Sequence, residues 1–193
     1  MIARGVTAPR AVLSWLTYTR IAAVPAVMTL ILLGPDRKSA YTVAAVVFAI
    51  AAMTDFADGY LARRWAVATK LGSFLDTTAD KLLVAGALIA LVDVGRASPV
   101  IAAIIIGREL VIMGLRGVVA AEGTVFPPSI WGKLKTNAQF IAIFLATLRL
   151  GKPVGPLHID EWVMIAAAVI TVMSAVEYLT RFSSALTGDA REG

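Results

Sequence analysis

The sequence lacks cysteine altogether, and charged residues make up only 16% of its 193 residues. Without cysteine, neither a disulfide framework nor a thiolate metal site exists. A soluble domain carries about 25% charged residues, so the composition favours a membrane protein. The net charge of +5 comes from scattered basic residues, with no basic run and no interleaved aromatic residues, which argues against a nucleic-acid partner.

Long apolar runs make up most of the chain. Apolar residues account for 59% of the sequence, and its mean hydropathy is +0.80. A helix that spans a bilayer needs about 20 mostly apolar residues. We therefore expect an all-α fold, an integral membrane bundle of six transmembrane helices over residues 13–34, 40–65, 71–94, 99–121, 130–150 and 161–182.

No internal repeat, low-complexity segment or long linker divides the chain, so residues 1–193 are expected to form a single membrane domain. We expect a short amphipathic segment over residues 1–12 and a disordered tail over 185–193. The first apolar run is too long for the core of a signal peptide, and no clear cleavage site follows it. Lysine and arginine are more numerous on the side that holds both termini, which places that side in the cytoplasm.

Four aspartates lie where the second apolar run ends and the third begins: Asp55, Asp58, Asp76 and Asp80. Ionisable side chains at membrane depth are costly and mark functional sites by default. Side chains three or four residues apart share a helix face, so the two members of each pair point the same way. Four neighbouring carboxylates need compensating charge, which two divalent ions would supply. Oxygen ligands suit Mg²⁺, Ca²⁺ or Mn²⁺.

Small residues and an arginine accompany these aspartates. Gly59 and Ala62 follow the first pair, and Gly72 precedes the second by one turn, so a pyrophosphate could come close to the backbone. Arg63 supplies a fork of donors suited to phosphate. The full pattern over residues 55–80 is D-x2-D-G-x2-A-R-x8-G-x3-D-x3-D, and it resembles the signature of the CDP-alcohol phosphotransferase family at every fixed position.

The resemblance implies a membrane enzyme that transfers a phosphatidyl group from CDP-diacylglycerol to an alcohol and releases CMP. It implies that Asp55, Asp58 and Asp76 hold two Mg²⁺ ions, for which Mn²⁺ could substitute. Asp80 would belong to the same metal set and would also act as the general base. The implied CDP-diacylglycerol site consists of Thr17, Arg20, Asp58, Gly59, Ala62, Arg63 and Gly72.

Polar residues in the first apolar run extend the resemblance. The family often shows Pro-Asn, two residues, Thr, two residues and Arg here. This chain has Leu13-Ser14 in place of Pro-Asn and then matches at Thr17 and Arg20. The alternative is structural: Ser14 would cap the helix, and Arg20 would snorkel to the interface. Both interpretations fit the sequence.

The fourth and fifth apolar runs carry further charged motifs, namely G-R-E-L at 107–110, G-L-R at 114–116 and W-G-K-L-K-T at 131–136. They resemble the phosphatidylglycerophosphate synthase branch of the family, which implies sn-glycerol 3-phosphate as the acceptor. We expect the acceptor phosphate to be bound by Arg108, Arg116, Lys133 and Lys135. Alternatively, the arginines would hydrogen-bond between helices and the lysines would lie at the interface.

The resemblance also implies a homodimer in the lipid bilayer of a bacterial inner or plasma membrane. Two alternatives within the family remain, a sister enzyme that uses inositol phosphate and another phospholipid synthase. A remote alternative is an ion or metal transporter. A transporter would distribute its acidic residues through the midplane and often shows paired halves, whereas here the acidic residues cluster on one side.

Overall fold

The computed structural model describes residues 7–65, 70–121, 129–149 and 153–189, and within these ranges the fold is all-α. The helices are α1 (Thr7–Leu32), α2 (Lys38–Trp65), α3 (Lys70–Asp93), α4 (Pro99–Ala121), α5 (Ile130–Leu148) and α6 (Ile159–Asp189). This confirms the predicted all-α class and the six helices. α1 already begins at Thr7, and α6 continues to Asp189, so parts of the expected N-terminal segment and C-terminal tail are helical.

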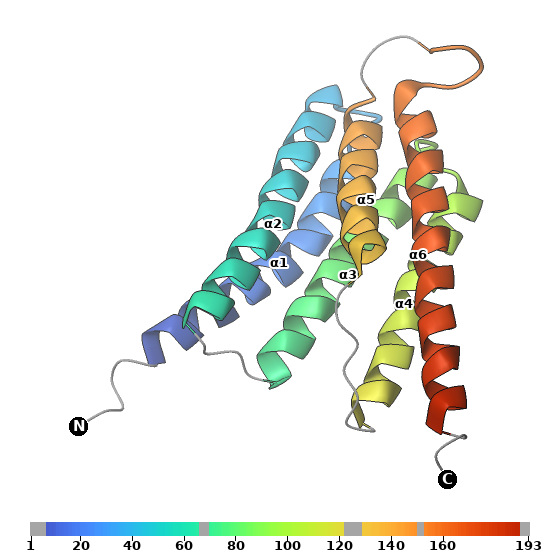
Figure 1. The fold of residues 1–193 in the computed structure, drawn as a ribbon. Coiled ribbons are helices and arrows are strands. Elements are labelled where there is room, and N and C mark those ends of the chain that lie inside the picture. The colour runs from blue at the N-terminus through green and yellow to red at the C-terminus, as the bar shows by residue number, and fades with distance from the viewer. Residues whose placement is uncertain (1–6, 66–69, 122–128, 150–152, 190–193) are drawn as a thin grey trace.

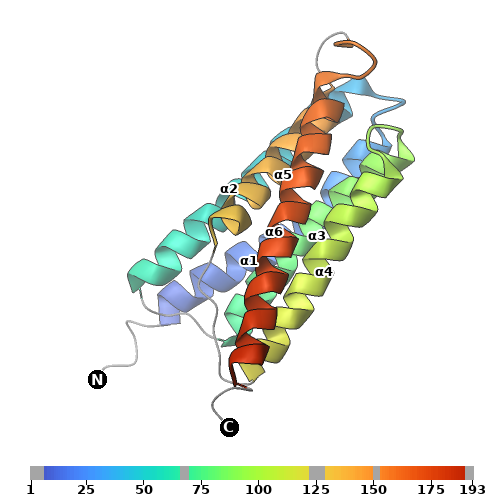
Figure 2. The same ribbon diagram turned by 45° about the vertical axis from the view of Figure 1, so that its right-hand side comes forward.

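The helices form an elongated bundle and run between its two opposite ends (Figures 1 and 2). α1 packs on α2 and α3, α5 packs on α6 and α2, and α4 packs on α6 and α3. α1 begins and α6 ends at the same end of the bundle, where α2 also ends and α3 begins. The family-like signature spans the end of α2 and the start of α3, so it lies at this end, which we call the signature end.

Small apolar residues let the helices approach closely in the core. Ala44, Ala87, Ala142, Ala146 and Ala167 are almost completely buried. Larger side chains fill the remaining space, among them Phe48 of α2 and Phe140 of α5, whose rings meet edge to face at 5.9 Å. Aromatic pairs in this geometry add about 0.5–1.5 kcal/mol beyond their burial.

The opposite end of the bundle is held by Tyr41 and Arg96. The Arg96 guanidinium lies 3.4 Å from the Tyr41 ring centroid and donates a 2.6 Å hydrogen bond to the Thr147 carbonyl. A side chain at Gly34 would overlap the same tyrosine ring. Arg96 therefore satisfies a carbonyl at the end of α5, which the helix itself leaves without a partner.

Apolar side chains also cover much of the outer surface, including Val100, Ile104, Val111, Val169 and Val172. Of the described helices, one contains a stretch long and apolar enough to cross a membrane, residues Ile159–Ser183 of α6. Shorter apolar stretches occupy Thr17–Leu32 and Lys38–Thr54. α3, α4 and α5 carry charged side chains within their length, and most residues of the candidate site are among them.

Candidate active site

The signature is divided between two helices at the signature end of the bundle (Figure 1). Residues 55–63 belong to the last turns of α2, and residues 72–80 to the first turns of α3. The side chains of Asp55, Asp58, Ala62 and Arg63, and the surroundings of Gly59, lie outside the described part of the structure. The described members of the signature are therefore those on α3.

Asp76 faces α1 through an ion pair. Its Oδ1 accepts a 2.7 Å hydrogen bond from Nη1 of Arg20, a side chain that is completely buried, while the Asp76 side chain is 34% exposed. Arg20 therefore does not snorkel to the interface, and that alternative is wrong. Thr17, one turn earlier on α1, is also buried. The α1 motif thus lies directly beside the signature.

Asp80 lies one turn deeper in the bundle, and its two oxygens have different surroundings. Oδ2 accepts a 2.9 Å hydrogen bond from Nζ of Lys81. Oδ1 is buried and has no hydrogen-bond partner among the described residues. A buried polar atom without a partner is costly, so Oδ1 can still accept a hydrogen bond or bind a cation.

Glu109 on α4 is the centre of a buried ionic cluster. Its carboxylate, 4% exposed, lies 2.8 Å from Nζ of Lys81 and 3.2 Å from Nη1 of Arg108, and it accepts a hydrogen bond from Nζ of Lys135. Gln139 lies beside the same carboxylate at 3.4 Å and donates to Thr171 at 2.9 Å. The cluster joins α3, α4, α5 and α6, and we call it the Glu109 cluster.

The Glu109 cluster contains two of the four residues predicted to bind the acceptor phosphate, Arg108 and Lys135. Arg108 also donates to Ser174 of α6 at 2.8 Å, so the helix–helix hydrogen bonding considered above does occur. Its Nε is nevertheless buried without a hydrogen-bond partner among the described residues. Lys135 is buried, which excludes the interfacial position considered for it.

The other two predicted phosphate ligands lie outside this cluster. Arg116 is exposed, and its guanidinium lies 5.6 Å from the Tyr178 ring centroid of α6. Lys133 is exposed as well. Residues two apart on a helix point in different directions, which explains why Lys133 and Lys135 separate.

Several members of the Glu109 cluster were not among the predicted site residues, including Glu109 itself, Lys81 and Gln139. Lys81 links Asp80 of the signature to Glu109, and Gln139 links Glu109 to α6. A signal for Lys81 was available, because a lysine inside an apolar helix needs a partner. Its partner Glu109 lies on another helix, which the sequence does not specify.

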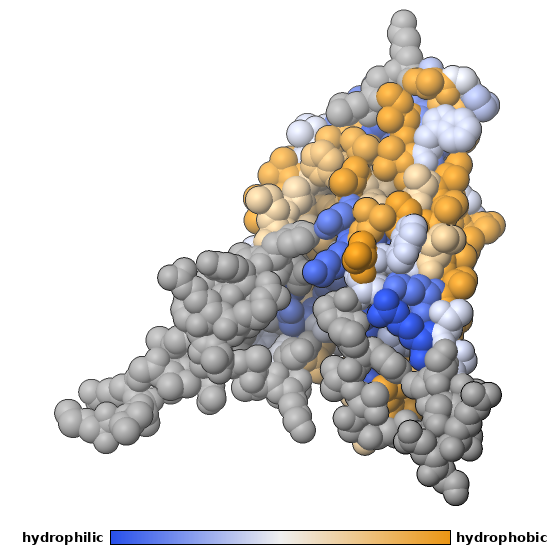
Figure 3. All heavy atoms as spheres, in the orientation of Figure 1, coloured by the Kyte–Doolittle hydropathy of each residue, from blue (hydrophilic) through white to orange (hydrophobic). Residues whose placement is uncertain are grey.

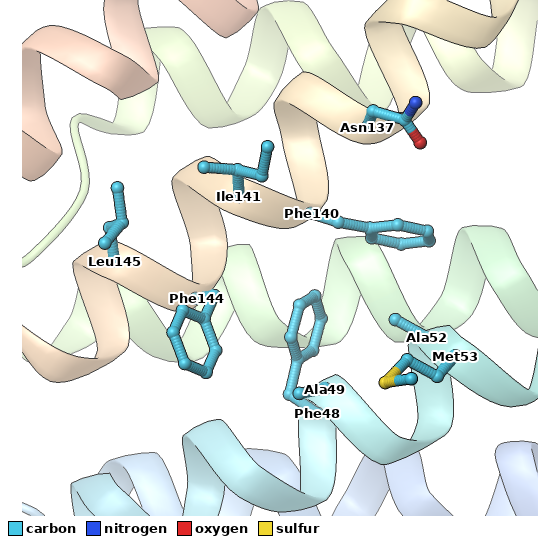
Figure 4. A pocket seen from close by; sticks show the side chains of 9 residues that line it. All are labelled: Phe48, Ala49, Ala52, Met53, Asn137, Phe140, Ile141, Phe144 and Leu145. Carbon is cyan, nitrogen blue, oxygen red and sulfur yellow. The ribbon is translucent and has the colours of Figure 1, made fainter.

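The surface separates polar from apolar regions. Figure 3 shows hydrophilic residues in the middle and lower part of the visible face, with hydrophobic residues above them. An apolar groove of ≈ 390 Å³ lies between α2 and α5 (Figure 4). Its lining includes Phe48 and Met53 of α2 and Phe140 and Phe144 of α5. The groove reaches Met53, two residues before the first aspartate of the signature.

The donor set suits a divalent metal. Asp76 and Asp80 are four residues apart on α3, so their carboxylates share one face of the helix. Carboxylate oxygens are the ligands that Mg²⁺ and Mn²⁺ prefer. Among the side chains described, no three acidic or histidine residues gather around one point. Asp55 and Asp58 lie outside that set.

Comparison with known proteins assigns the chain to a family. Residues 11–173 match the family model for CDP-alcohol phosphatidyltransferase, and the chain belongs to this family of transferases. The match covers the described part of the signature, Arg20 and the Glu109 cluster. It confirms the family resemblance inferred from the D-x2-D-G-x2-A-R-x8-G-x3-D-x3-D pattern.

Curated relatives narrow the resemblance to one branch. A Mycobacterium tuberculosis protein named "Probable phosphatidylglycerophosphate synthase" is 41% identical over 168 residues, covering 86% of this chain and 78% of its own length. A Bacillus subtilis protein named CDP-diacylglycerol–glycerol-3-phosphate 3-phosphatidyltransferase is 37% identical over 183 residues, covering 89% and 94%. A Haemophilus influenzae protein of the same name is 35% identical over 147 residues, covering 74% and 78%.

Proposed function

We propose that this protein transfers the phosphatidyl group of CDP-diacylglycerol to sn-glycerol 3-phosphate, giving phosphatidylglycerophosphate and CMP. The observation that best supports this proposal is a continuous network of ion pairs. It runs from Asp80 through Lys81 to Glu109, Arg108 and Lys135. It ends in a buried oxygen of Asp80 on one side and a buried N–H of Arg108 on the other, neither with a hydrogen-bond partner among the described residues. A hydroxyl and a phosphate on one small molecule would satisfy these two groups.

The acceptor phosphate would be bound by arginine and lysine side chains that the bundle brings close together. A phosphate taken from water into a buried site needs paired donors. Lys135 is buried and Arg108 half-buried beside Glu109, and the buried Nε of Arg108 is a donor still available to a ligand. Arg116 and Lys133, both exposed, would meet the phosphate at the entrance. An uncharged acceptor such as glycerol would leave these cations without a dianionic partner.

The reaction is a substitution at the phosphorus that carries the diacylglycerol. The acceptor hydroxyl forms a new P–O bond, its proton passes to Asp80, and the P–O bond to CMP breaks so that CMP leaves with the electron pair. Positioned proton transfer of this kind contributes about 10²–10⁴-fold to a rate. Oδ1 of Asp80, with Oδ2 already bonded to Lys81, is the oxygen we assign to this proton.

Divalent-metal dependence is general in this family. We assign two Mg²⁺ ions, replaceable by Mn²⁺, to Asp55, Asp58, Asp76 and Asp80. When bound, the ions would neutralise the pyrophosphate and the leaving CMP. Gly59, Ala62, Arg63, Gly72, Thr17 and Arg20 would surround the CDP moiety. The structural observation in favour is the ion pair that brings Arg20 of α1 to Asp76 of α3.

The protein must also accommodate the two acyl chains of the donor lipid. The apolar groove between α2 and α5 has the required chemistry and begins two residues from Asp55 (Figure 4). We assign it to an acyl chain of CDP-diacylglycerol. The bundle would then cross the membrane six times as one domain, with both termini and the signature end on the cytoplasmic side, and would act as a homodimer. The apolar outer surface supports this placement.

A panel of acceptors tests the proposal. Purified protein with CDP-diacylglycerol and Mg²⁺ is supplied in turn with glycerol 3-phosphate, inositol phosphate, glycerol and serine, and CMP is measured. Release with glycerol 3-phosphate at least about tenfold faster than with glycerol or serine is expected, since loss of one buried phosphate contact of about 1.4 kcal/mol gives that factor. Release with inositol phosphate, which keeps a phosphate, is expected to be slower than with glycerol 3-phosphate. Faster release with inositol phosphate would contradict the acceptor while leaving phosphatidyl transfer intact.

A further inference from the structure

Lys81 lies between two carboxylates of different helices. Its Nζ is 2.9 Å from Oδ2 of Asp80, the preceding residue on α3, and 2.8 Å from Oε2 of Glu109 on α4. The Lys81 side chain is 19% exposed, and those of Asp80 and Glu109 are 12% and 4% exposed. A single ammonium group therefore separates two buried negative charges.

The contact between Lys81 and Asp80 is unusual for neighbouring residues. Side chains at i and i+1 do not face each other on a helix. Lys81 has a long, flexible stem that can turn back, and here its ammonium group reaches both Asp80 and Glu109. The tertiary contact with α4 thus determines where the ammonium group lies, and this in turn determines which oxygen of Asp80 is engaged.

This contact gives the two carboxylate oxygens of Asp80 different surroundings. Oδ2 is fixed by Lys81, and Oδ1 stays buried with no hydrogen-bond partner among the described residues. We propose that Lys81 is a positioning residue, which clamps Asp80 between α3 and α4 so that Oδ1 faces the acceptor hydroxyl. This role rests on the proposed function, in which Asp80 accepts the proton of that hydroxyl.

The same contact ties the position of Asp80 to the residues that would hold the acceptor phosphate. Glu109 binds Lys81 on one side and Arg108 and Lys135 on the other. The group that receives the proton and the groups that hold the phosphate are therefore fixed to one carboxylate. A small acceptor held by its phosphate at Arg108 would present its hydroxyl to an aspartate of fixed orientation.

The test compares Lys81→Met with Lys81→Arg in the full-length protein. CMP release is measured with CDP-diacylglycerol and with glycerol 3-phosphate varied in turn, and rates are expressed per folded enzyme. We expect Lys81→Met to lower kcat by at least about 30-fold, part of the about 10²–10⁴-fold that a positioned general base contributes, with the glycerol 3-phosphate KM changed less than about threefold. Lys81→Arg should recover at least about a third of kcat, because arginine also bridges carboxylates. Lys38→Met, an exposed lysine at the far end of α2, is the matched control and should behave as wild type.

The melting temperature of Lys81→Met, measured in the same detergent as wild type, separates positioning from folding. A Lys81→Met protein that loses stability but not kcat, or a Lys81→Arg protein with a kcat no higher than that of Lys81→Met, would overturn the role of Lys81. Failure of wild type to release CMP with glycerol 3-phosphate would instead refute the proposed function itself.

Discussion

Replacing Glu109 by glutamine tests whether one buried carboxylate holds the cluster together. The Glu109 carboxylate contacts Lys81, Lys135 and Arg108 and is 4% exposed. Glutamine keeps the shape of the side chain but removes its charge. Lys135 then loses its counter-ion, and three cations face one another with only Asp80 left to balance them.

The magnitude of the loss follows from the burial of these groups. Removing one partner of a buried ion pair costs about 3–5 kcal/mol. Arg108 keeps its bond to Ser174, and Lys81 keeps its bond to Asp80, so the lower value, about 3 kcal/mol, is expected. For a chain of this length the melting temperature falls by about 2–4 °C per kcal/mol, which predicts a decrease of roughly 6–12 °C.

Thermal unfolding in a single detergent, followed by tryptophan fluorescence, measures this decrease. Glu177→Gln is the matched control, because Glu177 pairs with Arg181 one turn away on α6 and that arginine is 45% exposed. An exposed pair of this kind is worth only about 0.3–0.5 kcal/mol. A decrease for Glu109→Gln no larger than that for Glu177→Gln would refute the organising role of the cluster.

Four further predictions concern single residues and the metal. Asp80→Asn should lower kcat by about 10²-fold or more while CDP-diacylglycerol still binds. A kcat above about a tenth of the wild-type value would exclude Asp80 as the general base. Chelation should abolish turnover, and Mg²⁺ or Mn²⁺ should restore it; full activity in metal-free buffer would contradict the metal assignment. Arg116→Lys should raise the KM for glycerol 3-phosphate about tenfold, with the KM for CDP-diacylglycerol little changed, and an unchanged acceptor KM would remove Arg116 from the site. Gly34→Ala should lower the melting temperature, since its methyl group would overlap Tyr41; Gly107→Ala on α4, where a methyl group meets open space, is its control, and equal melting temperatures would contradict the packing.

The sequence alone was sufficient to predict where the helices lie and to which family the chain belongs. Apolar runs of sufficient length located all six helices, and α4 begins and ends at the predicted residues. The signature could be read because its residues lie close together in the chain and follow helical spacing. Local spacing is visible in a sequence, since residues three or four apart share a helix face.

The contacts between helices could not be predicted in the same way. Arg20 and Asp76 are 56 residues apart, and Lys135 and Glu109 are 26 apart, so these pairs depend on how helices pack. Arg108, Arg116, Lys133 and Lys135 are grouped in the sequence by their charge and by the motifs that contain them. Burial divides them, because Lys135 turns into the bundle while Lys133, two residues earlier, turns outward.

The most direct measurement follows the phosphate of the acceptor into the product lipid. Glycerol 3-phosphate labelled in its phosphate is incubated with CDP-diacylglycerol, Mg²⁺ and the purified protein, and labelled lipid and free CMP are quantified together. Transfer as proposed predicts one labelled phosphatidylglycerophosphate for each CMP released, with both products lost in Asp80→Asn. CMP released without labelled lipid, which would mean that water is the acceptor, would contradict it.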